Sequence, residues 1–305
     1  MNNNFNIEYP YKEANPFILK NQNFKDKLKQ FNKENIIIIS DFDFTMTRRF
    51  YINPKNNKKE HLLSGFGFYD LCPDLPEKFR KETMDLKLKY LKYENDSTIE
   101  YEERDKYIHY LFTEDIKKIV ELHLNKDFLE KSLESTFKFK PFYFRHGVKK
   151  FYEIITKNSI PQIIISGGIK DSIQKTLNIL DKNIDMRNIK IISNEFIYDK
   201  NDVVIDYKKP LIYTFNKSKI FKDNANNLDK KCILFLGDHI NDVDAIENIK
   251  CLEKLCIVFN NNKNEEEINN NFLKKYDCVI CNDGDFLFIN ELVQEIINKN
   301  NLRSE

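Results

Sequence analysis

Runs of apolar residues without polar alternation recur along this chain and predict strands that are buried on both faces. The first run is Ile36-Ile37-Ile38-Ile39, in which β-branched residues follow one another directly. Such a strand belongs inside a parallel sheet, because a strand with one open face would carry polar residues at alternate positions. Further runs of this kind lie at 160–165, 189–192, 232–236, 255–259 and 278–280.

Helical patterns lie between several of these runs. The segments 148–156 and 171–180 carry apolar residues at the spacing of one helix face. Strands that alternate with helices are typical of an α/β fold with a doubly wound, Rossmann-like parallel sheet. The segments 195–198 and 203–205, joined by the polar residues 199–202, predict a small β-hairpin added to the sheet.

The interval from 49 to 143 is far longer than an ordinary crossover between two parallel strands. Within it, the segments 75–93, 101–112 and 114–136 show helical spacing. We therefore expect a core domain made of 1–48 and 144–305, and an α-helical cap of 49–143 inserted after the first strand. A cap in this position can close over the strand ends and exclude water.

Two aspartates follow the isoleucine run, separated from it only by Ser40. Asp41 and Asp43 are one residue apart, so an extended backbone places both side chains on the same side. Open α/β sheets bind their ligands at the carboxyl ends of the strands. Two carboxylates there repel each other unless a cation joins them or one of them holds a proton. The alternative, a strand end that turns into a polar loop, suits a single aspartate better than this pair.

Three later segments carry chemistry of the same kind. Ser166-Gly167-Gly168 ends a predicted strand, and its hydroxyl and backbone N–H groups could hold an anion, although a simple turn of small residues is an equal alternative. Asp238 and Asp242 follow another strand and could add oxygen ligands for Mg2+, with a helix cap as the alternative for Asp238. Lys217 could reach a phosphate, but a lone lysine more often lies on the surface.

Composition excludes some functions. The formal net charge is +1, with 49 basic and 48 acidic residues, so we expect no nucleic-acid polymer as partner. The apolar runs are too short to cross a membrane, and the N-terminus lacks the pattern of a secretory signal. We therefore expect a cytoplasmic protein, monomeric and without a membrane partner.

The order of these segments resembles the haloacid dehalogenase-like superfamily: Asp-x-Asp-x-Thr, then Ser, then Lys, then Gly-Asp-x-x-x-Asp, each behind a strand-like run. The resemblance extends to a narrower group. The segments 158–161, 166–169, 192–194 and 215–217, with Tyr-Glu-Asn-Asp at 93–96, are similar to the cytosolic pyrimidine 5′-nucleotidase (type III) family. This similarity spans about 36–289 and is thinnest in the cap.

The resemblance implies a covalent phosphatase. It makes Asp41 the nucleophile that forms an aspartyl-phosphate. Asp43 is then the acid and base that protonates the leaving oxygen and later activates water. For this division of roles, the pKa values of the two carboxyl groups should differ.

The resemblance also assigns binding roles to residues of the core. The residues expected to hold the phosphate are Ser166, Gly167 and Lys217. The expected ligands of Mg2+ are Asp41, the Asp43 carbonyl and Asp238. The residues expected to support the site are Thr45, which would orient the loop, and Asp242, which would act indirectly.

The cap departs from the family pattern. Where the family tends to have Trp-Tyr-Thr-Lys-Ser, this chain has Leu-Phe-Thr-Glu-Asp at 111–115, and it contains no Trp. Asp115 therefore stands where the family has a base-contacting serine. Glu94 is kept, and as an acceptor it could bind an exocyclic amino group such as that of cytosine; a solvent-facing position is its alternative. A substitute aromatic wall, or simple core packing, is expected of Phe66, Phe68 and Tyr69.

Together these features predict a Mg2+-dependent 5′-nucleotidase whose substrate is a small-molecule nucleoside monophosphate, with pyrimidine nucleotides preferred. One alternative is a phosphatase of another small phosphomonoester, such as 7-methylguanosine monophosphate or a phosphorylated metabolite. Another is a catalytically silent binding protein. A silent protein would be expected to lose residues of the core motifs, and all of them are present.

Overall fold

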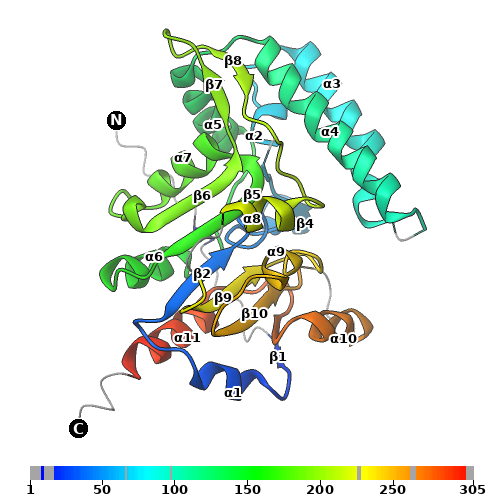
Figure 1. The fold of residues 1–305 in the computed structure, drawn as a ribbon. Helices are drawn as coiled ribbons and strands as arrows, with labels where there is room; N and C mark the ends of the chain where they lie inside the picture. The colour runs from blue at the N-terminus through cyan, green and yellow to red at the C-terminus, as the bar shows by residue number, and fades with distance from the viewer. Residues whose placement is uncertain are drawn as a thin grey trace.

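The isoleucine run forms a strand in the interior of a mostly parallel sheet (Figure 1). The structure is a computed structural model that describes residues 8–9, 17–65, 67–96, 98–224, 228–261 and 266–299. Within these residues, a seven-stranded sheet has the order β1-β11-β10-β9-β2-β5-β6, and only β1 runs antiparallel to its neighbour. Its strands are β1 (Ile18–Lys20), β2 (Ile36–Ser40), β5 (Gln162–Ile169), β6 (Ile189–Asn194), β9 (Cys232–Gly237), β10 (Glu253–Phe259) and β11 (Cys278–Ile280).

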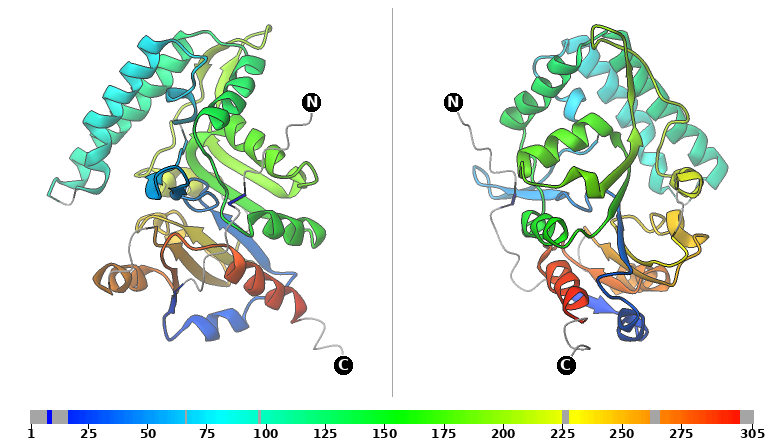
Figure 2. Two further views of the ribbon diagram at one scale, coloured as in Figure 1. Left: turned by 180° about the vertical axis from the view of Figure 1, so that it is seen from behind. Right: turned by 60° about the vertical axis from the view of Figure 1, so that its left-hand side comes forward.

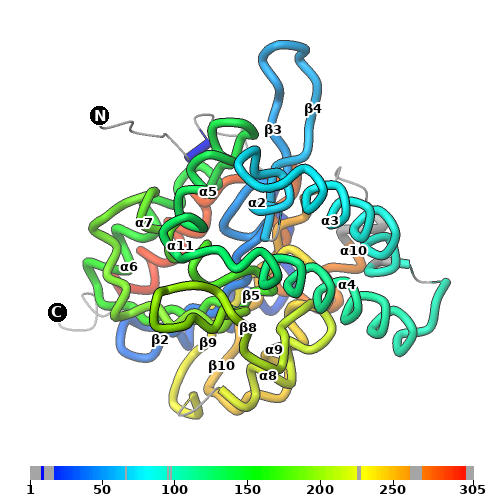
Figure 3. The backbone as a smooth tube through the Cα atoms, turned by 90° about the horizontal axis from the view of Figure 1, so that it is seen from above, coloured from blue at the N-terminus to red at the C-terminus, as the bar shows by residue number. Residues whose placement is uncertain are grey.

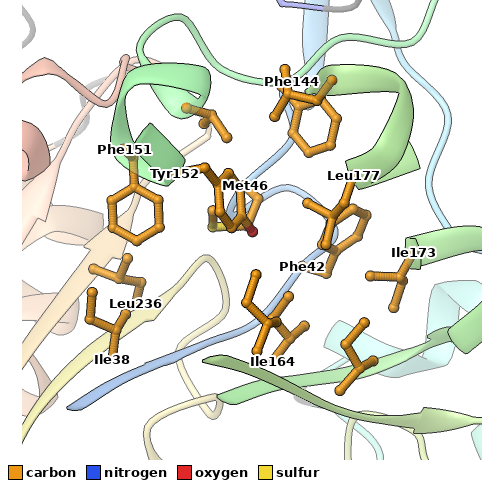
Figure 4. Packing of buried hydrophobic residues seen from close by; sticks show 14 of the residues in the cluster. Ile38, Phe42, Met46, Phe144, Phe151, Tyr152, Ile164, Ile173, Leu177 and Leu236 are labelled. Atoms are coloured by element: carbon orange, nitrogen blue, oxygen red, sulfur yellow. The ribbon is translucent and has the colours of Figure 1, made fainter. Parts of the chain in front are cut away.

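Both faces of β2 are buried, as its sequence predicts. Ile36 and Ile38 join one apolar cluster, and Ile37 and Ile39 join a second cluster on the opposite face of the sheet. Figure 4 shows the first cluster, where Ile38 and its neighbours on β5 and β9 face aromatic and aliphatic side chains of the covering helices. The alternation of side chains along an extended strand explains this division.

Helices cover both faces, so the predicted doubly wound α/β fold is confirmed. The first cluster contains residues of α1 (Phe24–Lys29), α6 (Val148–Lys157), α7 (Lys170–Leu180) and α11 (Leu287–Asn298). The second contains residues of α8 (Lys217–Asn224) and α9 (Asp244–Glu247), and partly buried residues of α10 (Glu266–Lys275) pack against it. A short 3-10 helix, η2 (Met186–Asn188), precedes β6. The predicted hairpin is also present, as β7 (Phe196–Tyr198) and β8 (Val204–Tyr207).

The segment 49–143 is not helical throughout, which corrects the sequence analysis. It begins with an antiparallel hairpin of β3 (Phe50–Asn53) and β4 (Lys58–His61), which projects from the body in Figure 3. β4 has the sequence Lys-Lys-Glu-His and its side chains are largely exposed. Hydrophobic periodicity cannot detect such a strand, because it buries no apolar face.

Helices make up the rest of this segment: α2 (Gly67–Asp70), α3 (Glu77–Tyr90), η1 (Leu91–Asn95), α4 (Tyr101–Glu121) and α5 (Lys126–Phe139). The helix α4 continues through 113, where the sequence analysis placed a break. The break falls instead before α5, where Asn125 accepts a hydrogen bond from the Phe128 N–H and caps the helix. The α3–α4 pair lies at the opposite end of the molecule from α1 and α11 (Figure 2). Among the described residues, the helices include none that is both long enough and apolar enough to cross a membrane.

Candidate active site

The carboxyl ends of three neighbouring strands bring the expected residues together. Ser40 of β2 pairs with Ile164 of β5 and with Leu236 of β9. The residues that follow, Asp41, Ser166 and Asp238, therefore lie at one edge of the sheet. They line a cavity of about 710 Å3 together with Asp43 and Lys217.

The loop after β2 turns sharply at Phe44, which has a left-handed backbone with φ of 57°. The Asp41 N–H donates to the Leu236 carbonyl at 3.0 Å, which anchors the start of the loop to β9. The Phe44 N–H donates to Oγ1 of Thr47 at 2.8 Å. Within the described part of the chain, the buried hydroxyl of Thr45 has no hydrogen-bond partner. The hydroxyl that orients the loop thus belongs to Thr47, which the sequence analysis overlooked.

Lys217 is buried rather than on the surface. It begins α8, and its Nζ lies 2.7 Å from Oδ2 of Asp41 and 3.0 Å from Oδ1 of Asp242. Burial disfavours its charge, but Asp242 and Asp41 outweigh this effect and raise the pKa of Lys217 above its usual value. The side chain therefore keeps its positive charge at the floor of the cavity.

An acidic cluster surrounds this lysine. Among the described residues, Asp41, Asp238 and Asp242 each place a carboxylate oxygen within 4.8 Å of the others. The Oδ2 atom of Asp242 also accepts the N–H groups of Asp238 and His239, at 3.1 and 2.9 Å. Asp242, expected to act only indirectly, thus both braces the loop after β9 and belongs to the cluster itself.

The arrangement and chemistry of this cluster suit a divalent cation. Burial, with Asp242 and Asp41 close by, raises the pKa of Asp238 well above its usual value. Burial also raises the pKa of Asp41 to about 7, although Lys217 opposes the shift. Buried carboxylates at this separation require protons or a cation to offset their repulsion, and an all-oxygen set is the kind that Mg2+ prefers. The residues present therefore fit the metal that the sequence analysis expects.

Asp43 also lines the cavity, two positions after Asp41. Its Oδ1 accepts the Gly65 N–H at 2.9 Å, and burial raises the pKa of its carboxyl group to about 6, against the effect of this hydrogen bond. Gly65 has φ of +45°, and a Cβ there would lie 3.2 Å from Oδ2 of Asp43, so only glycine suits this contact. Burial thus raises the pKa of Asp43 as well as that of Asp41. The sequence analysis expected the two environments to shift the two pKa values apart, but both shifts are in the same direction.

Ser166 and Gly167 leave the regular ladder near the end of β5. The pairing of β5 with β6 shifts its register between Ile165 and Ile169, so the strand continues past the expected turn but with an irregularity. The Oγ atom of Ser166 accepts the Gly168 N–H at 3.0 Å. A Cβ at Gly167 would lie 3.1 Å from the ring of Phe112, so the cap packs directly against this segment.

Cap residues form the opposite wall of the cavity. Glu94 from η1 and Asp115 from α4 both line it, with Lys87 from α3. Glu94 accepts a hydrogen bond from the hydroxyl of Thr214, which belongs to the core segment before Lys217. The expected cap residues are therefore brought to the same cavity as the core residues.

Asp115 does not stand alone. It is buried and lies 3.5 Å from Nζ of Lys87, which also contacts the buried carboxylate of Asp70. Among the described residues, neither Oδ1 of Asp115 nor Oδ1 of Asp70 has a hydrogen-bond partner. Burial raises the pKa of Asp115 and lowers that of Lys87, while their attraction opposes both shifts. The sequence analysis missed Lys87 because nothing in its helical pattern distinguishes it from other lysines.

The expected aromatic wall takes a different form. Phe68 and Tyr69 are buried in the first apolar cluster, which agrees with core packing, and Phe66 lies outside the described residues. The aromatic side chains that line the cavity include Phe44 and Phe112.

Comparison with known proteins identifies the family. The model of the pyrimidine 5′-nucleotidase (UMPH-1) family matches residues 44–297. The chain belongs to the pyrimidine 5′-nucleotidase family. It is therefore a 5′-nucleotidase, a phosphoric monoester hydrolase with a haloacid dehalogenase-like core, and its substrate is a small nucleotide. The family resemblance of the motifs is thus confirmed.

Relatives of this nucleotidase cover nearly its whole length. It is 25% identical over 278 residues to the 7-methylguanosine phosphate-specific 5′-nucleotidase A of Xenopus laevis, covering 90% of this chain and 92% of the relative. A crystal structure of cytosolic 5′-nucleotidase IIIB bound to cytidine has a TM-score of 0.74 at 21% identity, covering 94% of this chain and 95% of the other. A HAD-family hydrolase from Salmonella enterica serovar Typhi has a TM-score of 0.50 at 16% identity, covering 88% of this chain and 73% of the other. These two structures show the shared fold.

Proposed function

We propose that this nucleotidase hydrolyses nucleoside 5′-monophosphates through a phosphoryl group carried on Asp41. The observation that carries the proposal is the convergence of Asp41, Lys217 and Ser166 on the floor of one cavity, with Asp43 beside them. Nucleophile, cation, hydroxyl donor and acid thereby meet where a phosphate group can enter. The phosphate would be held by Lys217, by the Ser166 hydroxyl and by the Gly167 N–H.

In the first step, an oxygen of the Asp41 carboxylate forms a bond to phosphorus while the bond from phosphorus to the nucleoside 5′-oxygen breaks. Asp43 gives its proton to that leaving oxygen, and burial raises the pKa of its carboxyl group. Burial raises the pKa of Asp41 as well, and Lys217 together with a cation at the acidic cluster would favour its ionised form. Lys217, which keeps its charge, offsets the negative charge on the transferring group.

In the second step, a water oxygen attacks phosphorus, and the bond between Asp41 and phosphorus breaks. Asp43, now ionised, accepts the proton of this water. Inorganic phosphate leaves, Asp41 is again a carboxylate and Asp43 again holds a proton. The cap, for which we propose the boundaries 49–143 over a core of 1–48 and 144–305, excludes bulk water from the first step.

We further propose that Mg2+ binds at the acidic cluster. Asp41, Asp238 and the Asp43 carbonyl would hold the ion, with Asp242 close enough to join them. When bound, Mg2+ offsets the repulsion between an attacking carboxylate and a phosphate dianion. Removal of metal by a chelator should abolish phosphate release, and added Mg2+ should restore it. Full activity in chelator with metal-free protein would refute this part of the proposal.

For the base, we propose a preference for pyrimidine nucleotides, read by Glu94. Its carboxylate lies in the cavity wall and can accept a hydrogen bond from the exocyclic amino group of cytosine or from the ring N–H of uracil. A single panel tests this: phosphate release from nucleoside monophosphates of all bases, with kcat/KM as the readout. Cytidine or uridine monophosphate should have the highest values.

One observation favours a second candidate, 7-methylguanosine monophosphate. The cap wall holds the carboxylates of Glu94, Asp115 and, behind them, Asp70, with Lys87 between the last two. A wall with this excess of negative charge would favour a base that carries a positive charge, as a guanine methylated at N7 does. The Xenopus relative is specific for 7-methylguanosine phosphate. The same panel separates the two candidates. We place either activity in the cytoplasm, following the name of the cytosolic structural neighbour.

A further inference from the structure

Asn261 connects two loops of the active site from a third strand. It lies just after β10, and its side chain is buried. Its Nδ2 donates to Oδ2 of Asp238 at 3.1 Å and to the backbone carbonyl of Phe44 at 3.1 Å. One amide group therefore joins the loop after β9 to the loop after β2.

Arg145 determines which way this amide points. The Nη2 atom of Arg145 donates to Oδ1 of Asn261 at 2.6 Å, and also donates to the Phe44 carbonyl. A guanidinium group can only donate, whereas a carbonyl and a carboxylate can only accept. The oxygen of the Asn261 amide must therefore face Arg145, and its nitrogen must face Asp238 and Phe44.

Arg145 is itself fixed. It is fully buried, and its Nη1 lies 2.9 Å from Oδ1 of Asp283 and 2.6 Å from the Gly284 carbonyl. Its Nε donates to the Thr45 carbonyl at 2.8 Å. The Arg145 guanidinium is thus fixed by hydrogen bonds on both edges. Its own hydrogen bond to Oδ1 of Asn261 therefore fixes the orientation of that amide.

We propose that Asn261, oriented by Arg145, is a positioning residue that sets the affinity of the Asp41–Asp238–Asp242 cluster for a divalent cation. With Oδ2 of Asp238 held by the amide, the other carboxylate oxygen is left for the ion. The same amide also holds the Phe44 carbonyl, which is one residue after the Asp43 carbonyl. Asn261 therefore positions both Asp238 and the backbone next to the Asp43 carbonyl, two of the proposed ligand groups. The inference rests on the metal site in the proposed function.

The test measures Mg2+ binding directly, by titration calorimetry on metal-free protein and by the rise in melting temperature that Mg2+ causes. The variant is Asn261→Ala, and Asn261→Gln keeps an amide but displaces it by one methylene. The matched control is Asn290→Ala, which removes another buried asparagine whose Nδ2 donates to the Gly147 carbonyl at 2.9 Å, outside the cavity.

We expect Asn261→Ala to raise the dissociation constant for Mg2+ about tenfold or more, the usual effect of losing a hydrogen bond that orients a metal ligand. Its activity should return toward that of the wild type at high Mg2+, and Asn290→Ala should keep wild-type Mg2+ affinity. If Asn261→Ala does not fold, Asn261→Gln decides the question by the same measurement.

Two other results overturn the inference in distinguishable ways. Unchanged Mg2+ affinity in a folded Asn261 variant, with normal binding in the wild type, shows that Asn261 serves the fold alone. Absence of Mg2+ binding in the wild type removes the metal site from the proposed function, and the inference falls with it.

Discussion

The Nζ atom of Lys217 lies 2.7 Å from Oδ2 of Asp41, although 176 positions separate the two residues in the sequence. This contact joins the start of α8 to the end of β2. It places the positive charge of Lys217 directly beside the proposed nucleophile. The lysine holds the carboxylate in one orientation. It also remains available to a phosphate group that approaches the same point.

Replacement of the proposed nucleophile, Asp41, is the most direct test of the mechanism. Asp41→Asn should fold, since it removes one carboxylate from a crowded acidic cluster, but an amide cannot form the phosphoryl intermediate. We expect phosphate release to fall by at least about a thousandfold. Circular dichroism would check the fold. Substantial residual turnover in clean Asp41→Asn protein would contradict the covalent route.

Asp43 should matter most when the leaving group needs a proton. A nucleoside alkoxide is a poor leaving group, whereas p-nitrophenolate leaves without protonation. For Asp43→Asn we expect kcat/KM to fall about 10²–10⁴-fold with a nucleotide and far less with p-nitrophenyl phosphate. Turnover at saturation should fall with both, because in the proposed mechanism Asp43 also activates water in the second step. Equal losses in kcat/KM for the two substrates would argue against Asp43 as the acid.

Glu94 can be tested as a reader of the base. Glu94→Ala should lower kcat/KM for cytidine monophosphate about ten- to a hundredfold, the effect of losing a charged hydrogen-bond acceptor, with little change for p-nitrophenyl phosphate. The control is Thr214→Val, which breaks the contact between Glu94 and the core but leaves the carboxylate in place. If both variants slow both substrates alike, the contact serves to hold the cap closed and Glu94 does not read the base.

Asp115 should tune which bases are preferred. Asp115→Ser leaves Lys87 paired with Asp70 and removes one negative charge from the cap wall. We expect the kcat/KM ratio of 7-methylguanosine monophosphate to uridine monophosphate to fall about tenfold or more, with total activity retained. Parallel assays of the two nucleotides give this ratio. An unchanged ratio would show that Asp115 only neutralises Lys87.

Features governed by neighbouring residues could be predicted from the sequence. The isoleucine run of β2 and the helical spacing of α6 and α7 mark their elements, since the side-chain period of a strand or a helix is local. The same holds for Asp41 and Asp43, which follow β2 directly. Their position at the sheet edge follows from the rule that parallel strands end together.

Contacts between distant segments required the tertiary structure. The sequence marks neither Asn261 nor Arg145, yet the two meet across 116 positions and orient Asp238. Lys87 likewise resembles any helix-surface lysine until α3 and α4 pack and leave it half-buried beside Asp115. The strand β4 escaped prediction because its residues Lys-Lys-Glu-His bury no apolar face, although Tyr51 of its partner strand β3 is buried. The sequence by itself thus determined the parallel strands of the central sheet, the core motifs and the family. Only the tertiary structure decided which polar groups are buried next to one another and must therefore pair by hydrogen bonds or charge. The reason is that burial depends on how distant segments of the chain pack.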